Sequence, residues 1–579
     1  MSINTILKLK NKYKTQLYLA LIILMAFYLR TFNINWDSNY YFHPDERAIA
    51  MFTTPIQMPH NISEFLSTDS PLNPHFFAYG NFPLYFLRFS GEIASYINPI
   101  YKAYGGIHII GRLISASVDT LTVFIVFLMG WKIFSKRVGL FASLLYALSV
   151  FPIQSSHFYT VDPLLAFFMT TTIFLLLISI QKPTIKRAVI IGIFFGLSLA
   201  TKISAFFLSL DILFATLLVL INQKSVKRTH VFLFLFSTLI SSLFVFVATQ
   251  PYAIIDFHSF ITQTQLQSQM SKNVFIFPYT LQYVGKIPYI YELKNIFFWG
   301  EGPIITTLNL LGIFFVIKKL KLKKLKESNL FFFLLFSITS YFLIFGKFAV
   351  GWMRYMLPIY PLICVFGGFF VSEFIISKIP KKYISNYYYR KIVLLVFLII
   401  LLVYPISFLS IYLDPNTRIQ ASDWISKNVP AGKRVAVEHW DDALPVYGGQ
   451  NYIQLTLPLY EPDTKQKWEG IISTLRSADY IFIASNRLYK TLQRLTDCKH
   501  LQIGRCYPIT SLYYKDLFSG KLGFKQIAEF SNYPTIPFIN IKLIDNDADE
   551  SFTVNDHPKI MIFKKFSESN YIDLTNFSN

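Results

Sequence analysis

Charged residues are scarce in this chain. They make up only 15% of its 579 residues, whereas hydrophobic residues make up 53%. This balance excludes an ordinary water-soluble protein, because a soluble chain has no core large enough for so many apolar side chains. The charge-free stretches 231–249 and 392–412 reach the roughly 20 residues that a helix needs to cross a bilayer. The sequence therefore predicts a polytopic helical membrane protein.

Cysteine is also rare, and metal-ligand spacings are lacking. Only three cysteines occur, and none belongs to a Cys/His pattern typical of a metal site. Cys498 and Cys506 lie close together in a polar region, where a disulfide and two free thiols are both compatible with the sequence. Cys364 lies in an apolar span and is expected to belong to the core. The cysteines therefore give no indication of a metal site.

The excess of positive charge does not point to nucleic acid. The formal net charge is +21, but the lysines and arginines stand in short clusters between hydrophobic spans. This is the pattern of cytoplasmic loops in membrane proteins. The clusters divide the chain into eleven predicted spans, with the N-terminus inside and the C-terminus outside. We expect a multi-pass protein of the plasma membrane, with the lipid bilayer as a partner and no nucleic acid.

The N-terminus resembles a signal peptide only in part. A lysine-rich segment precedes the apolar residues 17–29, but Arg30 and Thr31 follow where a small-residue cleavage site would stand. We therefore predict an uncleaved first helix whose end emerges outside. Residues 1–412 are predicted to form the membrane domain.

Residues 413–579 have the composition of a soluble domain. Predicted helices at 421–425, 471–476 and 488–495 alternate with predicted strands at 434–438 and 480–484. This alternation favours an extracytoplasmic α/β domain. No glycine-rich phosphate loop opens its helices, which argues against a nucleotide site. The acidic groups at Trp440-Asp441-Asp442 and Asp556-His557 carry either chemistry or, as is more common, solvated turns.

Two adjacent carboxylates, Asp45 and Glu46, follow the first span. Such pairs are common on solvated loops and mean little alone. Further ionisable residues, however, are predicted on the same side of the bilayer. A catalytic base at the membrane surface is then the natural hypothesis.

Four motifs share this external location and follow one another in a fixed order. The motifs are Asp45-Glu46-Arg47-Ala48, Ser156-His157-Phe158-Tyr159-Thr160-Val161-Asp162-Pro163, Gly196-Leu197-Ser198-Leu199-Ala200-Thr201-Lys202 and Arg354-Tyr355-Met356-Leu357-Pro358. With these motifs, the chain resembles the GT-C superfamily of membrane glycosyltransferases that use polyprenyl-phosphate sugars. It is most similar to the branch of protein O-mannosyltransferases and bacterial aminoarabinose transferases.

The resemblance implies an inverting single displacement on the external face, without a metal or other cofactor. The sugar is implied to pass from a polyprenyl-phosphate donor to an acceptor protein, lipid or glycan. Asp45 would be the general base and Glu46 would orient the acceptor or support that base. The remaining implied roles are acceptor or sugar binding for His157 and Asp162, and donor-phosphate binding for Lys202 and Arg354.

The same residues also have purely structural interpretations, and other functions are open. Lys202 also suits a snorkelling lysine, and Arg354 a membrane anchor. His108, Arg112, Ser115 and Asp119 follow helical spacing on one face, which favours a structural ion network over donor binding. A transporter or lipid flippase is the main alternative function, since charged residues inside helices also mark transport paths. A structural scaffold with a degenerate site is the third.

Overall fold

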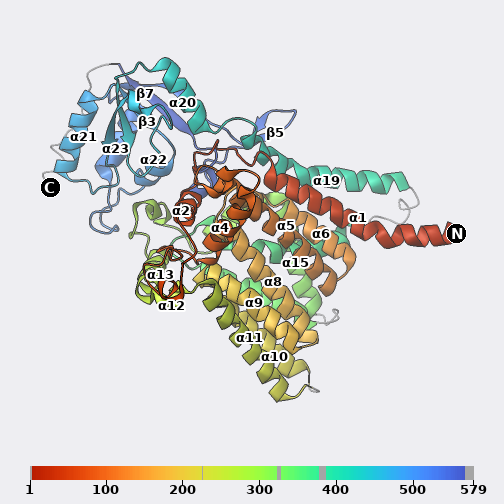
Figure 1. The fold of residues 1–579 in the computed structure, drawn as a ribbon. Helices are drawn as coiled ribbons and strands as arrows, with labels where there is room; N and C mark the ends of the chain where they lie inside the picture. The colour runs from red at the N-terminus through yellow and green to blue at the C-terminus, as the bar shows by residue number, and fades with distance from the viewer. Residues whose placement is uncertain (1–2, 224–225, 322–327, 377–386, 567–579) are drawn as a thin grey trace.

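The computed structural model describes residues 3–223, 226–321, 328–376 and 387–566 of the chain. Figure 1 shows a body of long helices with the main sheet gathered at one end, away from the N-terminus of α1 (Ile3–Thr31). The predicted fold class is confirmed: a polytopic helical membrane protein carries a C-terminal region of mixed strands and helices.

Within the described residues, eight helices are long and apolar enough to cross a membrane. Several are built from a helix and a short 3₁₀ or π segment that continues it. The eight are Ile107–Ile133 (α5), Val161–Gln181 (α8), Ile203–Ile221 (η2 and α10), Arg228–Thr249 (α11), Pro303–Leu320 (most of α15), Ser328–Phe345 (α16), Met353–Ile376 (η5, α17 and η6) and Lys391–Asn428 (most of α19, η7 and α20).

The other three predicted spans also coincide with helices, but they do not meet the same length and hydropathy criteria. Helices α6 (Lys136–Ala147) and α7 (Val150–Ser156) form a pair bent by 60°, which together would count as a ninth span. Helix α9 (Ile185–Thr201) has only 17 residues, and the apolar part of α1 is short and flanked by charge. The predicted count of eleven therefore exceeds what helix length and hydropathy support.

The long predicted loop between the first two spans is partly helical. It contains α2 (Pro44–Thr53), α3 (Ile62–Phe65), α4 (Phe82–Ser95) and the 3₁₀ helix η1 (Pro99–Lys102). A second such segment holds α12 (Tyr252–Ile255), α13 (Phe257–Lys272), η3 (Pro278–Tyr283), α14 (Ile290–Asn295) and the π-helix η4 (Ile296–Gly300).

A five-stranded mixed sheet forms the centre of the C-terminal region, in the order β2-β1-β3-β7-β4. Strand β1 is parallel to β2 and β3, whereas β7 is antiparallel to β3 and β4. The strands are β1 (Arg434–Glu438), β2 (Ile453–Leu457), β3 (Tyr480–Ile483), β4 (Phe524–Phe530) and β7 (Ile560–Lys565), with a separate hairpin of β5 (Thr535–Ile536) and β6 (Ile541–Lys542). The helices are α20 (Thr417–Asn428), α21 (Lys465–Ser477), α22 (Arg487–Leu492), α23 (Pro508–Phe518) and α24 (Glu550–Thr553).

Buried polar contacts hold this region against the helical body. The Asp556 carboxylate accepts hydrogen bonds from Gln154 of α7, at 2.9 Å, and from the Tyr412 hydroxyl, at 2.9 Å. His557 lies between Asp556 and Asp545, with its ring nitrogens 2.5 Å and 2.8 Å from their carboxylates. Burial alone would lower the pKa of His557, but the two carboxylates raise it to about 10. The solvated turn expected here is wrong, because these side chains are buried.

The predicted ion network on α5 is confirmed for its two charged members. Arg112 forms bidentate contacts with Asp37 and with Glu46, at 2.6–2.9 Å. Asp119 pairs with Arg30 at 2.5 Å. The ring nitrogens of His108 and the Ser115 hydroxyl have no hydrogen-bond partner among residues 3–223, 226–321, 328–376 and 387–566. Buried charges need such partners because their desolvation is costly.

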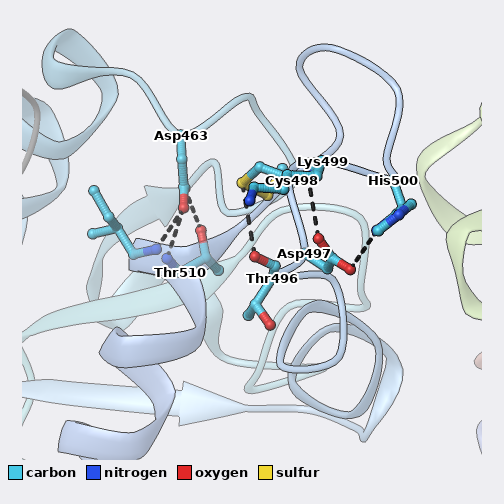
Figure 2. Close-up of a disulfide and its surroundings, with 9 residues drawn as sticks. Asp463, Thr496, Asp497, Cys498, Lys499, His500 and Thr510 are labelled. Atoms are coloured by element: carbon cyan, nitrogen blue, oxygen red, sulfur yellow. Dashed lines mark hydrogen bonds and ion pairs between the residues drawn. A yellow bond between two sulfur atoms is a disulfide. The ribbon is translucent and has the colours of Figure 1, made fainter. Parts of the chain in front are cut away.

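Cys498 and Cys506 form a disulfide in this structure, so the disulfide is the correct alternative. Figure 2 shows the disulfide together with Asp463, whose carboxylate accepts hydrogen bonds from the backbone and hydroxyl of Thr510. The third cysteine, Cys364, is buried in α17 as expected.

Candidate functional site

Helix α2 presents the acidic motif at its first turn. His43 is the N-cap residue, and its ring nitrogen Nδ1 accepts a hydrogen bond from the Asp45 amide at 3.2 Å. Pro44 occupies the first helical position, where its missing N–H has no cost. Asp45 and Glu46 follow in the first turn, where the helix dipole favours negative charge. The local sequence therefore places both carboxylates in the first turn of α2.

The side chains of Asp45 and Glu46 have different partners and different exposure. Glu46 is 1% exposed, and its oxygens accept two hydrogen bonds from Arg112 and one from the Tyr159 amide, at 2.8 Å. It does not line the main cavity described below, and its predicted role in orienting the acceptor or supporting the base stays a prediction. Asp45 is 21% exposed and forms an ion pair with Arg354 of η5 (Met353–Ile359).

Asp45 is held in its ionised form. Burial would raise the pKa of its carboxyl group, but Arg354, His43, Tyr79 and Lys202 outweigh burial and hold that pKa below its usual value. Burial lowers the pKa of the neighbouring His43 to about 4, so this ring is neutral at pH 7. A neutral ring can accept the hydrogen bond from the Asp45 amide, which agrees with its capping role.

Lys202 and Asp162 lie beside this ion pair. The Lys202 ammonium contacts Asp162 Oδ1 at 3.0 Å, and Arg354 Nε lies 4.0 Å from Asp162 Oδ2. Within the described part of the chain, neither Asp162 Oδ2 nor Arg354 Nε has a hydrogen-bond partner, although both atoms are buried. Two cations and two anions from four separate segments thus meet with part of their hydrogen-bonding capacity unused.

Aromatic rings surround the cations. Lys202 lies 5.0 Å from the ring centre of Tyr355 and 5.9 Å from that of Tyr79. Tyr79 is held here by Gly80, because a Cβ at that position would lie 1.8 Å from the Ala200 carbonyl oxygen at the end of α9. The close approach also places the Gly80 amide 3.0 Å from the Thr201 carbonyl oxygen.

The group opens into a cavity of about 470 Å³, which we call the main cavity. Its polar lining includes Asp162, Lys202, Arg354 and Lys272 of α13. Much of the remaining lining is apolar, contributed by Leu165, Leu199, Phe206, Phe207, Phe345 and Phe348. Asp45 does not line the cavity, but it forms an ion pair with Arg354, which does. Such a cavity suits an amphiphilic ligand with an anionic group.

His157 lies elsewhere. It is fully buried, with its ring nitrogens 2.9 Å and 3.0 Å from the carbonyl oxygens of Ile153 and Phe32, and its ring stacks on Tyr412 at 4.2 Å. The structure therefore does not bring it to the main cavity, and its predicted contact with the acceptor or sugar stays a prediction. Sequence reasoning assigned no role to Tyr79, which belongs to none of the four motifs, or to Tyr355, which lies within the Arg354-Tyr355-Met356-Leu357-Pro358 motif.

Comparisons with known proteins agree with this architecture. Residues 104–248 match the family model described as dolichyl-phosphate-mannose-protein mannosyltransferase. This match includes Asp162 and Lys202 but neither Asp45 nor Arg354. No curated protein matches the chain in sequence.

Solved structures extend the likeness to nearly the whole chain. The apo oligosaccharyltransferase of Archaeoglobus fulgidus aligns with a TM-score of 0.53 at 14% identity, covering 93% of this chain and 75% of that one. The chain has the GT-C fold. The AglB oligosaccharyltransferase from the same organism, in complex with an inhibitory peptide and a dolichol-phosphate, aligns with a TM-score of 0.50 at 13% identity, covering 96% and 89%. ArnT from Cupriavidus metallidurans, bound to undecaprenyl phosphate, has a TM-score of 0.45 at 14% identity, covering 83% and 94%.

The GT-C resemblance expected from the motifs is thus confirmed for the fold. Within the described residues, no group of three or more His, Cys, Asp or Glu side chains is arranged to hold a metal ion.

Proposed function

We propose that the protein transfers a sugar from a polyprenyl-phosphate carrier to an acceptor on the external face of the membrane. The observation that carries this proposal is the main cavity, which combines Lys202 and Arg354 with a largely aromatic and aliphatic wall. A sugar linked through phosphate to an isoprenoid lipid has the matching chemistry, because its phosphate is anionic and its tail is apolar. The AglB structure, which is a complex with a dolichol-phosphate, supports the same donor class.

Lys202 and Arg354 would bind the donor phosphate. Arg354 retains an unused Nε donor next to the cavity, and a guanidinium group can bind phosphate through two parallel hydrogen bonds. The phosphate would compete with Asp45 for Arg354 and so free the Asp45 carboxylate. Asp162 keeps both cations in place and has one oxygen available for a sugar or acceptor hydroxyl.

Asp45 would act as the general base. The acceptor oxygen attacks the anomeric carbon as the bond from that carbon to the phosphate oxygen breaks. The acceptor proton passes to Asp45, and the bonding electron pair leaves with the phosphate, which the two cations stabilise. A single displacement of this kind inverts the anomeric centre. Glu46 would support the base indirectly, by fixing α2 to Arg112.

The simplest test follows the donor. Purified protein in detergent is incubated with polyprenyl-phosphate sugars that carry a radiolabelled sugar, and release of the free carrier is measured. The proposal expects the wild-type protein to consume at least one donor and Asp45→Asn to be the matched inactive control. A transporter or flippase would leave every donor intact, and that result would reject the proposal.

The orientation in the membrane is part of the proposal. Basic clusters favour a cytoplasmic N-terminus, and the Cys498–Cys506 disulfide favours an oxidising compartment for the C-terminal region. Cysteines introduced at the exposed positions Ser63 and Ser135 test it. In intact cells a membrane-impermeant thiol reagent should label the first and not the second. The reverse pattern would place Asp45 in the cytoplasm and contradict the scheme.

A further inference from the structure

A loop of the C-terminal region reaches the helix that carries Asp45. The Asp442 carboxylate accepts a hydrogen bond from Arg47 of α2 at 3.0 Å, and it lies 3.7 Å from Arg418. Asp441 contacts the same Arg418 at 3.3 Å. The loop that follows β1, from Trp440 to Asp442, therefore contacts α2 at Arg47, two residues after the proposed base. Its acidic residues are not the solvated turn expected from sequence.

Trp440 is unusual within this loop. Its side chain is 42% exposed, and its backbone has a φ of +73°, in the left-handed region that bulky residues avoid. Surrounding contacts hold this conformation, since Arg487 donates to the Trp440 carbonyl oxygen at 3.0 Å and Asp441 is anchored beside it. A strained residue that the surroundings keep in place is a common mark of a functional site.

Aromatic rings connect Trp440 with the proposed donor site. Arg354 lies over the Trp352 ring at 5.2 Å, Trp352 is 6.2 Å from Tyr279, and Tyr279 is 6.3 Å from Trp440. Trp352 is the N-cap residue of η5, Tyr279 lies in η3, and Trp440 belongs to the C-terminal region. The indole N–H of buried Trp352 has no hydrogen-bond partner among the residues that the structure describes. We call Tyr279, Trp352 and Trp440 the aromatic wall.

We propose that the aromatic wall binds a sugar ring of the acceptor, so that the acceptor is a carbohydrate. This inference rests on the proposed transferase function. The apolar face of a pyranose packs on an aromatic ring, while its edge hydroxyls need charged or polar partners. Asp442, Arg47 and Arg487 supply such partners around Trp440. The wall leads from this exposed end to Arg354, and thus towards the reacting centre.

The test compares acceptors and Trp440 variants in the full chain in detergent. Mannotetraose, maltotetraose, cellotetraose and a serine- and threonine-rich peptide are offered with each labelled donor. We expect at least one saccharide to accept the label. Trp440→Ala should raise the KM for that saccharide about tenfold, with little change in kcat or in donor KM, and Trp440→Phe should restore most of the loss. Trp131→Ala is the matched control, because Trp131 is 44% exposed on α5, far along the chain from the wall.

A second measurement separates this inference from the transferase proposal. Saccharide binding to wild type and Trp440→Ala is followed by saturation-transfer NMR without any donor. If the donor is consumed but the sugar passes only to the peptide, or to no saccharide, the carbohydrate assignment is overturned. It is also overturned if Trp440→Ala binds the saccharide as tightly as the wild type does. If no donor is consumed but saccharide binding depends on Trp440, the transferase scheme fails and the sugar-binding wall stands.

Discussion

Two arginines in this protein each lie between two carboxylates, but they differ in what they leave unused. Arg112 is fully buried, and its guanidinium group is saturated by Asp37, Glu46 and the Ile34 carbonyl oxygen. Arg354 is 21% exposed, forms an ion pair with Asp45 and lies 4.0 Å from Asp162 Oδ2. Among the described residues its Nε has no hydrogen-bond partner, and this atom lies beside the main cavity. Both come from predicted spans or their ends, and sequence alone does not distinguish them.

The contrast separates a structural charge from one that is available to a ligand. A buried arginine with all its donors used can only stabilise the fold, because any new partner must displace an existing one. An arginine with an unused donor next to a cavity can gain a phosphate and lose Asp45. Four predictions test whether the two arginines behave in these different ways.

The largest effect is expected when the saturated arginine is removed. Arg112→Met leaves the buried carboxylates of Asp37 and Glu46 without their cation, which typically costs about 3–5 kcal/mol. We expect a lower melting temperature in detergent and little folded protein. Arg354→Met is the matched control and should fold normally. Equal stability of the two variants would remove the distinction between the sites.

The next largest effect concerns the base. Asp45→Asn keeps the volume of the side chain but removes the proton acceptor, and this should lower turnover by about 10²- to 10⁴-fold. Its melting temperature should stay near that of the wild type. Glu46→Gln should instead lower the melting temperature, and its loss of turnover per folded molecule should be smaller than that of Asp45→Asn. Turnover of Asp45→Asn within about threefold of wild type would exclude Asp45 as the base.

A smaller effect is expected on donor binding. Lys202→Met and Arg354→Met should each raise the donor KM by about tenfold or more, the arginine change having the larger effect because a bidentate contact is lost. Steady-state kinetics over a range of donor concentrations measure this. If Lys202 only snorkels to the headgroups and Arg354 only anchors its helix, donor kinetics will be unchanged in both variants.

The smallest effect is a shift in pH dependence. In the wild type the pKa of Asp45 lies below its usual value of 3.8, so the base stays ionised through neutral and mildly acidic pH. Arg354 is the largest cause that lowers it, and burial raises it. Arg354→Met should therefore move the acidic limb of kcat/KM to higher pH. Lys202→Met should move it less, and a larger shift in that variant would contradict the assignment.

Much of the membrane fold follows from sequence because hydrophobic length and basic clusters are local signals. Every predicted span coincides with a helix, and strands β1 and β3 lie where apolar runs predicted them. The strands β2, β4, β5, β6 and β7 were not predicted. β4 contains Lys525, Gln526 and Glu529 and is largely exposed, so it lacks the apolar run of a buried strand. β7 begins with the apolar run 560–563, but its pairing with β3 and β4 joins segments far apart in the chain and cannot be derived from local sequence.

The sequence predicted which charged residues lie at the site, but not which partner each of them contacts. Asp45, Asp162, Lys202 and Arg354 meet as expected, and their roles stay proposals. Glu46 and His157 have the same side-chain chemistry as functional residues, yet Arg112 holds the first and backbone carbonyls surround the second. Which way a side chain points from a helix end depends on long-range packing. A motif therefore indicates which residues are near a site, and not which of them face it.

The contacts of Asp556 have a consequence for any attempt to shorten or exchange the C-terminal region. Gln154 and Tyr412 belong to the helical body, and both donate to a carboxylate that the C-terminal region supplies. A truncated chain would remove the acceptor of these two donors and would release Arg47 of α2 from Asp442. The helical body and the C-terminal region thus share polar contacts that truncation would break. Replacement domains would have to reproduce both carboxylates in position before the helical body could keep its shape.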